Sequence, residues 1–176
     1  MNRKGIAKFE KVSWEQFLEA WEDVLPLIDE KYTRKLYDEL KLPKRATKDS
    51  AGYDFYLPHD LTLAPGQTAK IPTGIRCKID PEWVLMCFPR SGLGFKYRLQ
   101  LDNTVGIIDG DYYYSDNEGH IFLKITNDTY DMRKTIDLDA GKGFAQGIFV
   151  PYGLTVDDDT TAIRNGGFGS TDKKEG

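Results

Sequence analysis

Residues 61–88 read LTLAPGQTAKIPTGIRCKIDPEWVLMCF, and this stretch decides the fold class. It contains short apolar runs separated by turn residues: Leu61–Leu63, Thr68–Ile71, Ile75–Ile79 and Trp83–Phe88. Runs this short at this spacing are typical of an all-β sandwich or barrel and not of alternating strands and helices. Pro65-Gly66 is a turn pair, because proline fixes one backbone torsion and glycine accepts a positive one.

The same texture extends in both directions from this stretch. Further short apolar runs occur at Tyr53–Leu57, Ile121–Thr126 and Phe144–Val150. The pattern begins after Pro43, so we predict an all-β domain over residues 43–156.

Residues 1–42 predict an N-terminal extension of two helices. Ser13 followed by Gln16 fits a capping box, in which each side chain satisfies the other residue's free backbone N–H. Pro26 separates two apolar stripes at helical spacing. The first stripe consists of Trp14, Phe17, Leu18, Trp21 and Leu25, and the second of Ile28, Tyr32, Leu36 and Leu40. Such stripes usually pack against a neighbouring element.

Residues 157–176 predict a flexible, Gly-rich C-terminal arm. Three glycines, Gly166, Gly167 and Gly169, surround Phe168, and this composition sustains neither a helix nor a buried strand. Two interpretations stay open from the residues alone. The segment is either a frayed terminus or an arm that becomes ordered over a ligand.

Composition sets further bounds on the 176 residues. The formal net charge is −4 and no basic run is longer than Lys173-Lys174, which argues against a nucleic-acid partner. No apolar stretch approaches the roughly 18 residues that span a membrane, and no secretory signal is seen, so we expect a cytoplasmic protein without a membrane partner. Cys77 and Cys87 lie in apolar runs and are expected to be buried thiols.

The arm carries residue types that suit a nucleotide. Arg164, Ser170 and Thr171 supply donors for phosphate, and Phe168 supplies a flat face for a base. Glycines such as Gly169 let the backbone approach a ligand closely.

Two more segments combine a turn with polar side chains. Arg90, Ser91 and Gly92 follow an apolar strand directly and could surround a phosphate, although Gly-rich turns after strands are common. Asp109 follows Ile108 at the end of an apolar pair, where a carboxylate could deprotonate a water. The alternative for Asp109 is a turn in which it bonds its own backbone.

Two short segments are weaker candidates. Asp54, in Ala51–Asp54, could hold a water on a divalent cation or cap a turn. Gln146 lies inside an apolar run, where its amide needs a partner. His59 and His120 have no adjacent Cys or His, so zinc spacing is missing, and no GxSxG sequence occurs.

Taken in order, these five segments resemble the five motifs of the deoxyuridine triphosphate nucleotidohydrolase (dUTPase) family. They are Ala51–Asp54, Pro89–Leu93, Asn103–Tyr112, Ala145-Gln146 and Arg164–Thr171. The resemblance runs from about Leu42 to Thr171. It implies a jelly-roll-like β-barrel, a homotrimer with shared active sites, and hydrolysis of dUTP to dUMP and pyrophosphate with Mg²⁺.

The resemblance also implies a role for each motif. Asp109 would be the general base, and Asp54 would hold a magnesium-bound water. Tyr112 would pack against the deoxyribose and exclude a 2′-hydroxyl, and Asn103 would bond the uracil edge. Gly106 and Ile108 are also expected to bind the substrate. The residues expected on the triphosphate and over the base are Arg90, Ser91, Gly92, Gln146, Arg164, Phe168, Gly169, Ser170 and Thr171.

The chain departs from the family pattern at three places. Tyr114 stands where a glycine is usual, and the lengthened segment 115–119 ends in Gly119, which could take that role. Gly143 stands where an arginine is typical, and motif five is one residue shorter after Arg164.

Two other functions stay open at this stage. A dCTP deaminase has a similar fold, although it uses a glutamate where Asp109 stands. A nucleotide-dependent regulatory protein would use the N-terminal helices as a partner surface.

Overall fold

The computed structural model describes residues 5–164 and 166. Its helices are α1 (Trp14–Val24), α2 (Glu30–Glu39), α3 (Ser91–Tyr97) and the 3-10 helix η1 (Gly110–Tyr114). Its strands are β1 (Ala7–Lys11), β2 (Lys44–Arg45), β3 (Tyr53–Tyr56), β4 (Leu61–Leu63), β5 (Thr68–Pro72), β6 (Ile75–Ile79), β7 (Trp83–Pro89), β8 (Leu99–Leu101), β9 (Gly106–Ile108), β10 (Phe122–Asn127), β11 (Ile136–Leu138) and β12 (Gly143–Pro151).

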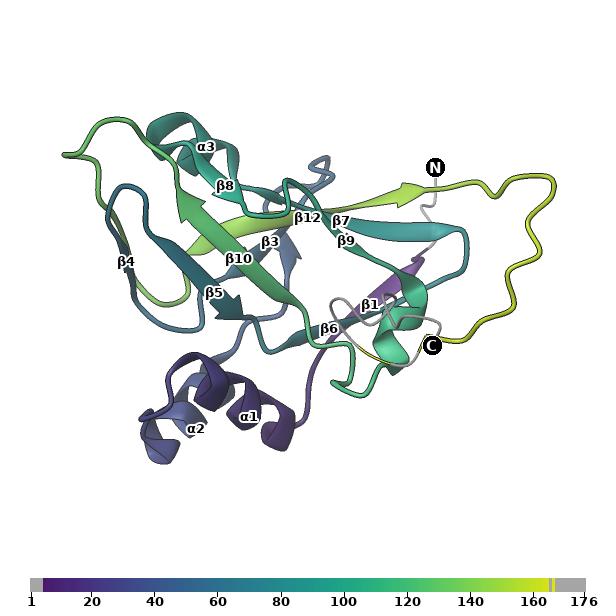
Figure 1. The fold of residues 1–176 in the computed structure, drawn as a ribbon, viewed down its shortest axis with the longest axis horizontal. Helices are drawn as coiled ribbons and strands as arrows, with labels where there is room; N and C mark the ends of the chain where they lie inside the picture. Colours follow the sequence, from purple (N-terminus) through teal and green to yellow (C-terminus); the bar gives the residue numbers. More distant parts are fainter. Residues whose placement is uncertain (1–4, 165, 167–176) are drawn as a thin grey trace, which may run out of the picture.

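The predicted all-β fold class is confirmed, and the strands form antiparallel sheets around one core (Figure 1). The largest sheet has the order β2-β3-β12-β7-β9, and a second has the order β5-β10-β8. The pairs β1-β6 and β11-β4 complete the described sheets. The hydrogen bonds of the described residues leave these sheets separate and do not close them into one continuous barrel.

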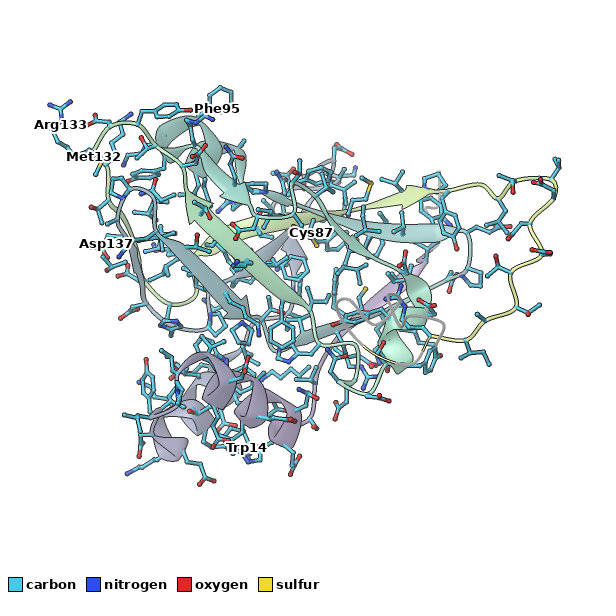
Figure 2. The ribbon with its side chains drawn as sticks, in the orientation of Figure 1. Trp14, Cys87, Phe95, Met132, Arg133 and Asp137 are labelled. Atoms are coloured by element: carbon cyan, nitrogen blue, oxygen red, sulfur yellow. The ribbon has the colours of Figure 1, made fainter. Side chains whose placement is uncertain are left out.

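Alternation of side chains explains the strands that the sequence predicts. In β6, Ile75, Cys77 and Ile79 are buried, while Arg76 and Lys78 between them point away from the core. Cys87, labelled in Figure 2, lies on β7 and is buried, and this burial raises the pKa of its thiol to about 12. Both cysteines are free and buried, as predicted.

The two helices of the N-terminal extension are confirmed, but residues 1–42 are not helical throughout. β1 pairs antiparallel with β6 and so belongs to the β domain. The run AKFEK is short and strongly charged, which hides its alternation of Ala7 and Phe9 with polar residues. Tertiary pairing with β6, and not local preference, decides its conformation.

The helices are fixed to the sheet at a close approach around Gly74. Gly74 has φ +72°, and a Cβ there would lie 2.4 Å from Leu40 Cδ1 and 2.9 Å from Phe17 Cε2. Phe17, Trp21, Leu36 and Val12 form a small buried cluster of their own. No helix in the described part of the chain is long and apolar enough to cross a membrane.

The capping box of α1 is half confirmed. Ser13 Oγ accepts the backbone N–H of Gln16 at 3.1 Å, as predicted. The reciprocal bond differs, because the N–H of Ser13 donates to the carboxylate of Glu118 at 2.8 Å. The cap is therefore completed from a segment that is distant in the sequence.

Candidate active site

The register of β12 places residues of motifs one and four opposite each other. Gln146 lies opposite Asp54 on β3 and opposite Phe88 on β7. Arg90, just after β7, places its Nε 3.2 Å from Asp54 Oδ1, and Gln146 Nε2 donates to the carbonyl of Pro89 at 3.3 Å. Residues of motifs one, two and four therefore meet at this end of the large sheet. We call these residues the phosphate-side group: Asp54, Arg90, Ser91, Gly92 and Gln146.

Two glycines make room for this group. A Cβ at Gly52 would lie 2.6 Å from Gln146 Oε1, and one at Gly143 would lie 2.8 Å from Arg90 Nη1. The carbonyl of Gly143 also accepts from Arg90 Nη1 at 3.4 Å. Glycine in place of the family's usual arginine at position 143 therefore leaves space for the Arg90 guanidinium.

Ser91 and Gly92 open a short helix, α3, where the sequence suggested a loop. Both residues are exposed, and Arg90 is also exposed at the preceding cap position. Their donors are therefore accessible to a ligand.

Motif three lies on β9, which pairs with the middle of β7 through Ile108 opposite Leu85 and Gly106 opposite Cys87. Ile108 is buried, and a Cβ at Gly106 would lie 3.2 Å from Cys87 Cβ. These two residues can reach a ligand through their backbones, whereas the Asn103 side chain is exposed.

Asp109 and Tyr112 lie at the end of this motif in different surroundings. The Asp109 side chain is half exposed, while Tyr112 is buried and its pKa is raised by that burial. The Tyr112 hydroxyl donates to the carbonyl of His120 at 2.6 Å and accepts from Asn117 Nδ2 at 2.9 Å. The hydroxyl is therefore engaged inside the protein, and a ligand could meet the ring alone.

Arg164 joins the motif-five arm to motif three. Its Nη2 lies 2.6 Å from Asp109 Oδ2, and its Nε lies 3.0 Å from Asp111 Oδ1. Its guanidinium carbon lies 5.8 Å from the centre of the Tyr112 ring. Figure 1 shows the arm leaving β12 and returning toward η1, the helix that contains Asp111 and Tyr112. Phe168, Gly169, Ser170 and Thr171 lie outside the described residues.

The phosphate-side group and Asp109 of motif three do not meet within one chain. Ile108, next to Asp109, is paired with Leu85, and Arg90 lies five residues further along. At about 3.3 Å per residue, the strand separates these points by roughly 17 Å.

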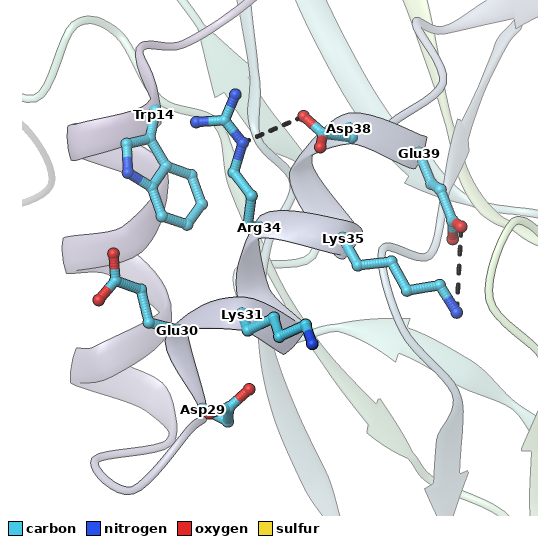
Figure 3. A pocket seen from close by; sticks show the side chains of 8 residues that line it. All are labelled: Trp14, Asp29, Glu30, Lys31, Arg34, Lys35, Asp38 and Glu39. Atoms are coloured by element: carbon cyan, nitrogen blue, oxygen red, sulfur yellow. Dashed lines mark hydrogen bonds and ion pairs between the residues drawn. The ribbon is translucent and has the colours of Figure 1, made fainter.

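The described surface has two large hollows, and residues of motif three line one of them. One of about 550 Å³ is lined by Asp109, Asp111, Lys78, Trp83 and Tyr152. A larger one of about 960 Å³ lies between α1 and α2, beside Trp14 and the ion pairs Arg34–Asp38 and Lys35–Glu39 (Figure 3). The larger hollow is lined by none of the predicted site residues.

The described residues include no group of three or more His, Cys, Asp or Glu side chains that could hold a metal ion. Asp54 is the carboxylate of the phosphate-side group and is partly buried beside Arg90. This donor set fits Mg²⁺ bound mainly by phosphate and water oxygens, with Asp54 in contact with a water.

Comparison with known proteins identifies the family of this chain. A family model described as dUTPase matches residues 38–172. The chain belongs to the dUTPase family. The deoxyuridine 5′-triphosphate nucleotidohydrolase of Lactococcus lactis is 40% identical over 136 residues, covering 75% of this chain and 88% of that protein. The Escherichia coli protein of the same name is 38% identical over 144 residues, covering 77% and 90%.

Solved dUTPase structures share the fold. The dUTPase from Streptococcus mutans is 35% identical, with a TM-score of 0.60 over 84% of this chain and 97% of that chain. The dUTPase of Staphylococcus aureus phage phi11, 19% identical with a TM-score of 0.61, shows the fold alone.

Sequence reasoning missed several residues of this candidate site. Asp111 is one of them, since it pairs with Arg164. Asn117 and His120 hold the Tyr112 hydroxyl. The lengthened segment 115–119 was the available signal, but its contacts depend on long-range packing.

Proposed function

We propose that this chain hydrolyses dUTP to dUMP and pyrophosphate, with Asp109 as the general base for a water that attacks the α-phosphate. The observation that carries the proposal is the placement of Asp109. Its carboxylate is half exposed at the end of β9, beside a hollow and paired with an arginine of motif five. A carboxylate within hydrogen-bond reach of a water can accept its proton.

The phosphate-side group would hold the triphosphate. Arg90, Ser91 and Gln146 offer donors at one end of the sheet, and Arg90 can exchange Asp54 for a phosphate oxygen. Mg²⁺ bound on the triphosphate would neutralise its charge and orient it. Asp54 would hold a water of that ion.

The nucleoside would lie against motif three. Asn103 would bond the uracil edge, and the backbones of Gly106 and Ile108 would line the same strand. The fixed ring of Tyr112 would pack on the deoxyribose and leave no space for a 2′-hydroxyl.

A homotrimer would bring the separated groups together. Because roughly 17 Å of β7 lies between Arg90 and the strand pair next to Asp109, one triphosphate needs groups from different copies. Phe168 would then stack on the base, with Gly169, Ser170 and Thr171 closing over the phosphates.

The test is pyrophosphate release from dUTP, dTTP, dCTP and UTP with and without Mg²⁺. We expect selective, Mg²⁺-dependent turnover of dUTP. Comparable rates on dCTP or dTTP, or release of ammonia from dCTP, would refute the proposal and favour the deaminase alternative. A scattering mass near the 20.0 kDa of one chain would refute the trimer.

A further inference from the structure

The segment of residues 115–120, which we call the 115–120 loop, is a compact unit directly after motif three. The backbone N–H of Glu118 donates to the carbonyl of Ser115 at 2.8 Å, and that of His120 donates to Asn117 at 3.0 Å. Gly119 has φ +69°, and a Cβ there would lie 2.6 Å from Tyr113 Cα. The loop therefore returns tightly against the backbone of η1.

This loop holds the Tyr112 side chain from both sides of its hydroxyl. His120 supplies the acceptor and Asn117 supplies the donor. A hydroxyl with two partners on one short loop fixes the ring orientation as long as the loop keeps its shape.

Glu118 fastens the same loop to the N-terminus of α1. Its Oε2 accepts the N–H of Ser13 at 2.8 Å, and its Oε1 accepts the hydroxyl of Ser13 at 2.6 Å. Arg76 Nη1 lies 3.7 Å from Oε2, and Arg76 Nη2 donates to the carbonyl of Tyr113 at 2.8 Å. One carboxylate therefore connects the helical extension, β6 and the loop.

The backbone of Glu118 is itself unfavourable for its residue type. Its φ is +56°, a region in which glycine is favoured over residues with a Cβ. Glutamate at this position is therefore accounted for by the contacts of its carboxylate and not by the turn.

We propose that Glu118 is a positioning residue for sugar selectivity, through which the N-terminal helical extension fixes the Tyr112 ring. This inference rests on the proposed function, because it assigns Tyr112 the contact with the deoxyribose. The helices would then act on the site without touching the nucleotide.

The experiment compares the dUTP:UTP ratio of kcat/KM in full-length variants. In Glu118→Ala we expect this ratio to fall roughly tenfold, the lower end of what one small group is worth in a pocket. The change should come from better use of UTP, with kcat for dUTP nearly unchanged. Glu118→Gln keeps one acceptor oxygen for Ser13 and should restore part of the ratio.

Glu118→Gly and Glu15→Ala separate positioning from stability. Gly relieves the positive φ while removing the carboxylate, so it should be more stable than Glu118→Ala and still lose selectivity. Glu15 lies in the first turn of the same helix and is exposed, so Glu15→Ala should keep the ratio. Hydrogen exchange of residues 112–120 should quicken in Glu118→Ala and Glu118→Gly alone.

The outcomes are distinct. A wild-type preference for dUTP that both Glu118→Ala and Glu118→Gly retain overturns this inference and leaves the proposed function standing. A dUTP:UTP ratio of kcat/KM that falls in step with the melting temperature across the variants also overturns this inference. A wild-type chain that does not hydrolyse dUTP overturns the proposed function and this inference with it.

Discussion

Arg164 places its guanidinium 2.6 Å from the carboxylate of Asp109, joining the C-terminal arm to the end of β9. The arm residues 157–163 before Arg164 are exposed, so this contact and that with Asp111 hold the start of motif five. A triphosphate offers more negative charge than two carboxylates. Binding of a nucleotide should therefore draw Arg164 from Asp109, which frees the carboxylate to take a proton.

Truncation before Arg164 tests the role of the arm. The folded core should persist, because Phe168 is the one large apolar residue that the cut removes. We expect kcat for dUTP to fall by about 100-fold or more, since removal of one preorganised charged donor has an effect of this size. Single-turnover kinetics and a thermal melt check this, and a truncated chain as fast as the full chain would show that the arm is only a frayed end.

Asp109→Asn tests the general base directly. The side chain is half exposed, and Asn still accepts a hydrogen bond from Arg164, so stability and nucleotide affinity should change little. The kcat should fall by about 100- to 10,000-fold, the range for loss of a general base. A near-normal kcat in the variant would return Asp109 to a role in the turn.

Much of this fold could be predicted because its signal is local. The alternation of apolar and polar residues in β6 and the apolar stripes of α1 and α2 can be recognised from residues close together in the sequence. β1 could not be recognised, since five mixed residues become a strand only against β6. The motifs of the site were visible as residue types, but the half of the α1 cap that Glu118 supplies depends on a contact between residues 105 positions apart.

Gly143→Ala tests the space that Arg90 occupies. The added Cβ would lie 2.8 Å from Arg90 Nη1, at the flexible end of that side chain, so Arg90 should shift with little loss of stability. We expect a higher KM for dUTP and weaker Mg²⁺ dependence, because the Asp54–Arg90 pair is displaced. Gly153→Ala is the control, since a Cβ at Gly153 meets nothing within 4 Å. Equal KM values in both variants would contradict the role of Gly143.

His120 should make the protein less stable in mild acid. Burial, with a contribution from Lys70, lowers the pKa of His120 from its ordinary 6.5 to about 3. Between these values the unfolded chain binds a proton that the folded chain does not, so the free energy of unfolding falls as the pH falls. The slope approaches about 1.4 kcal/mol per pH unit, and the full stability is present above the ordinary value.

The structure also indicates what the proton would disrupt. His120 Nε2 accepts the N–H of Gly74 at 2.8 Å, and among the described residues Nδ1 has no hydrogen-bond partner. A protonated imidazole would set two donors against each other beside Gly74, where α1 and α2 are fixed to the sheet.

His120→Gln supplies an acceptor oxygen that does not titrate. Urea denaturation from pH 7 to pH 4 should therefore show a smaller loss of stability in His120→Gln than in the wild type. His59 also has a lowered pKa, so His120 is isolated by the difference between the two proteins in the slope of unfolding free energy against pH. Parallel slopes would mean that His120 takes up its proton equally in the folded and unfolded chain.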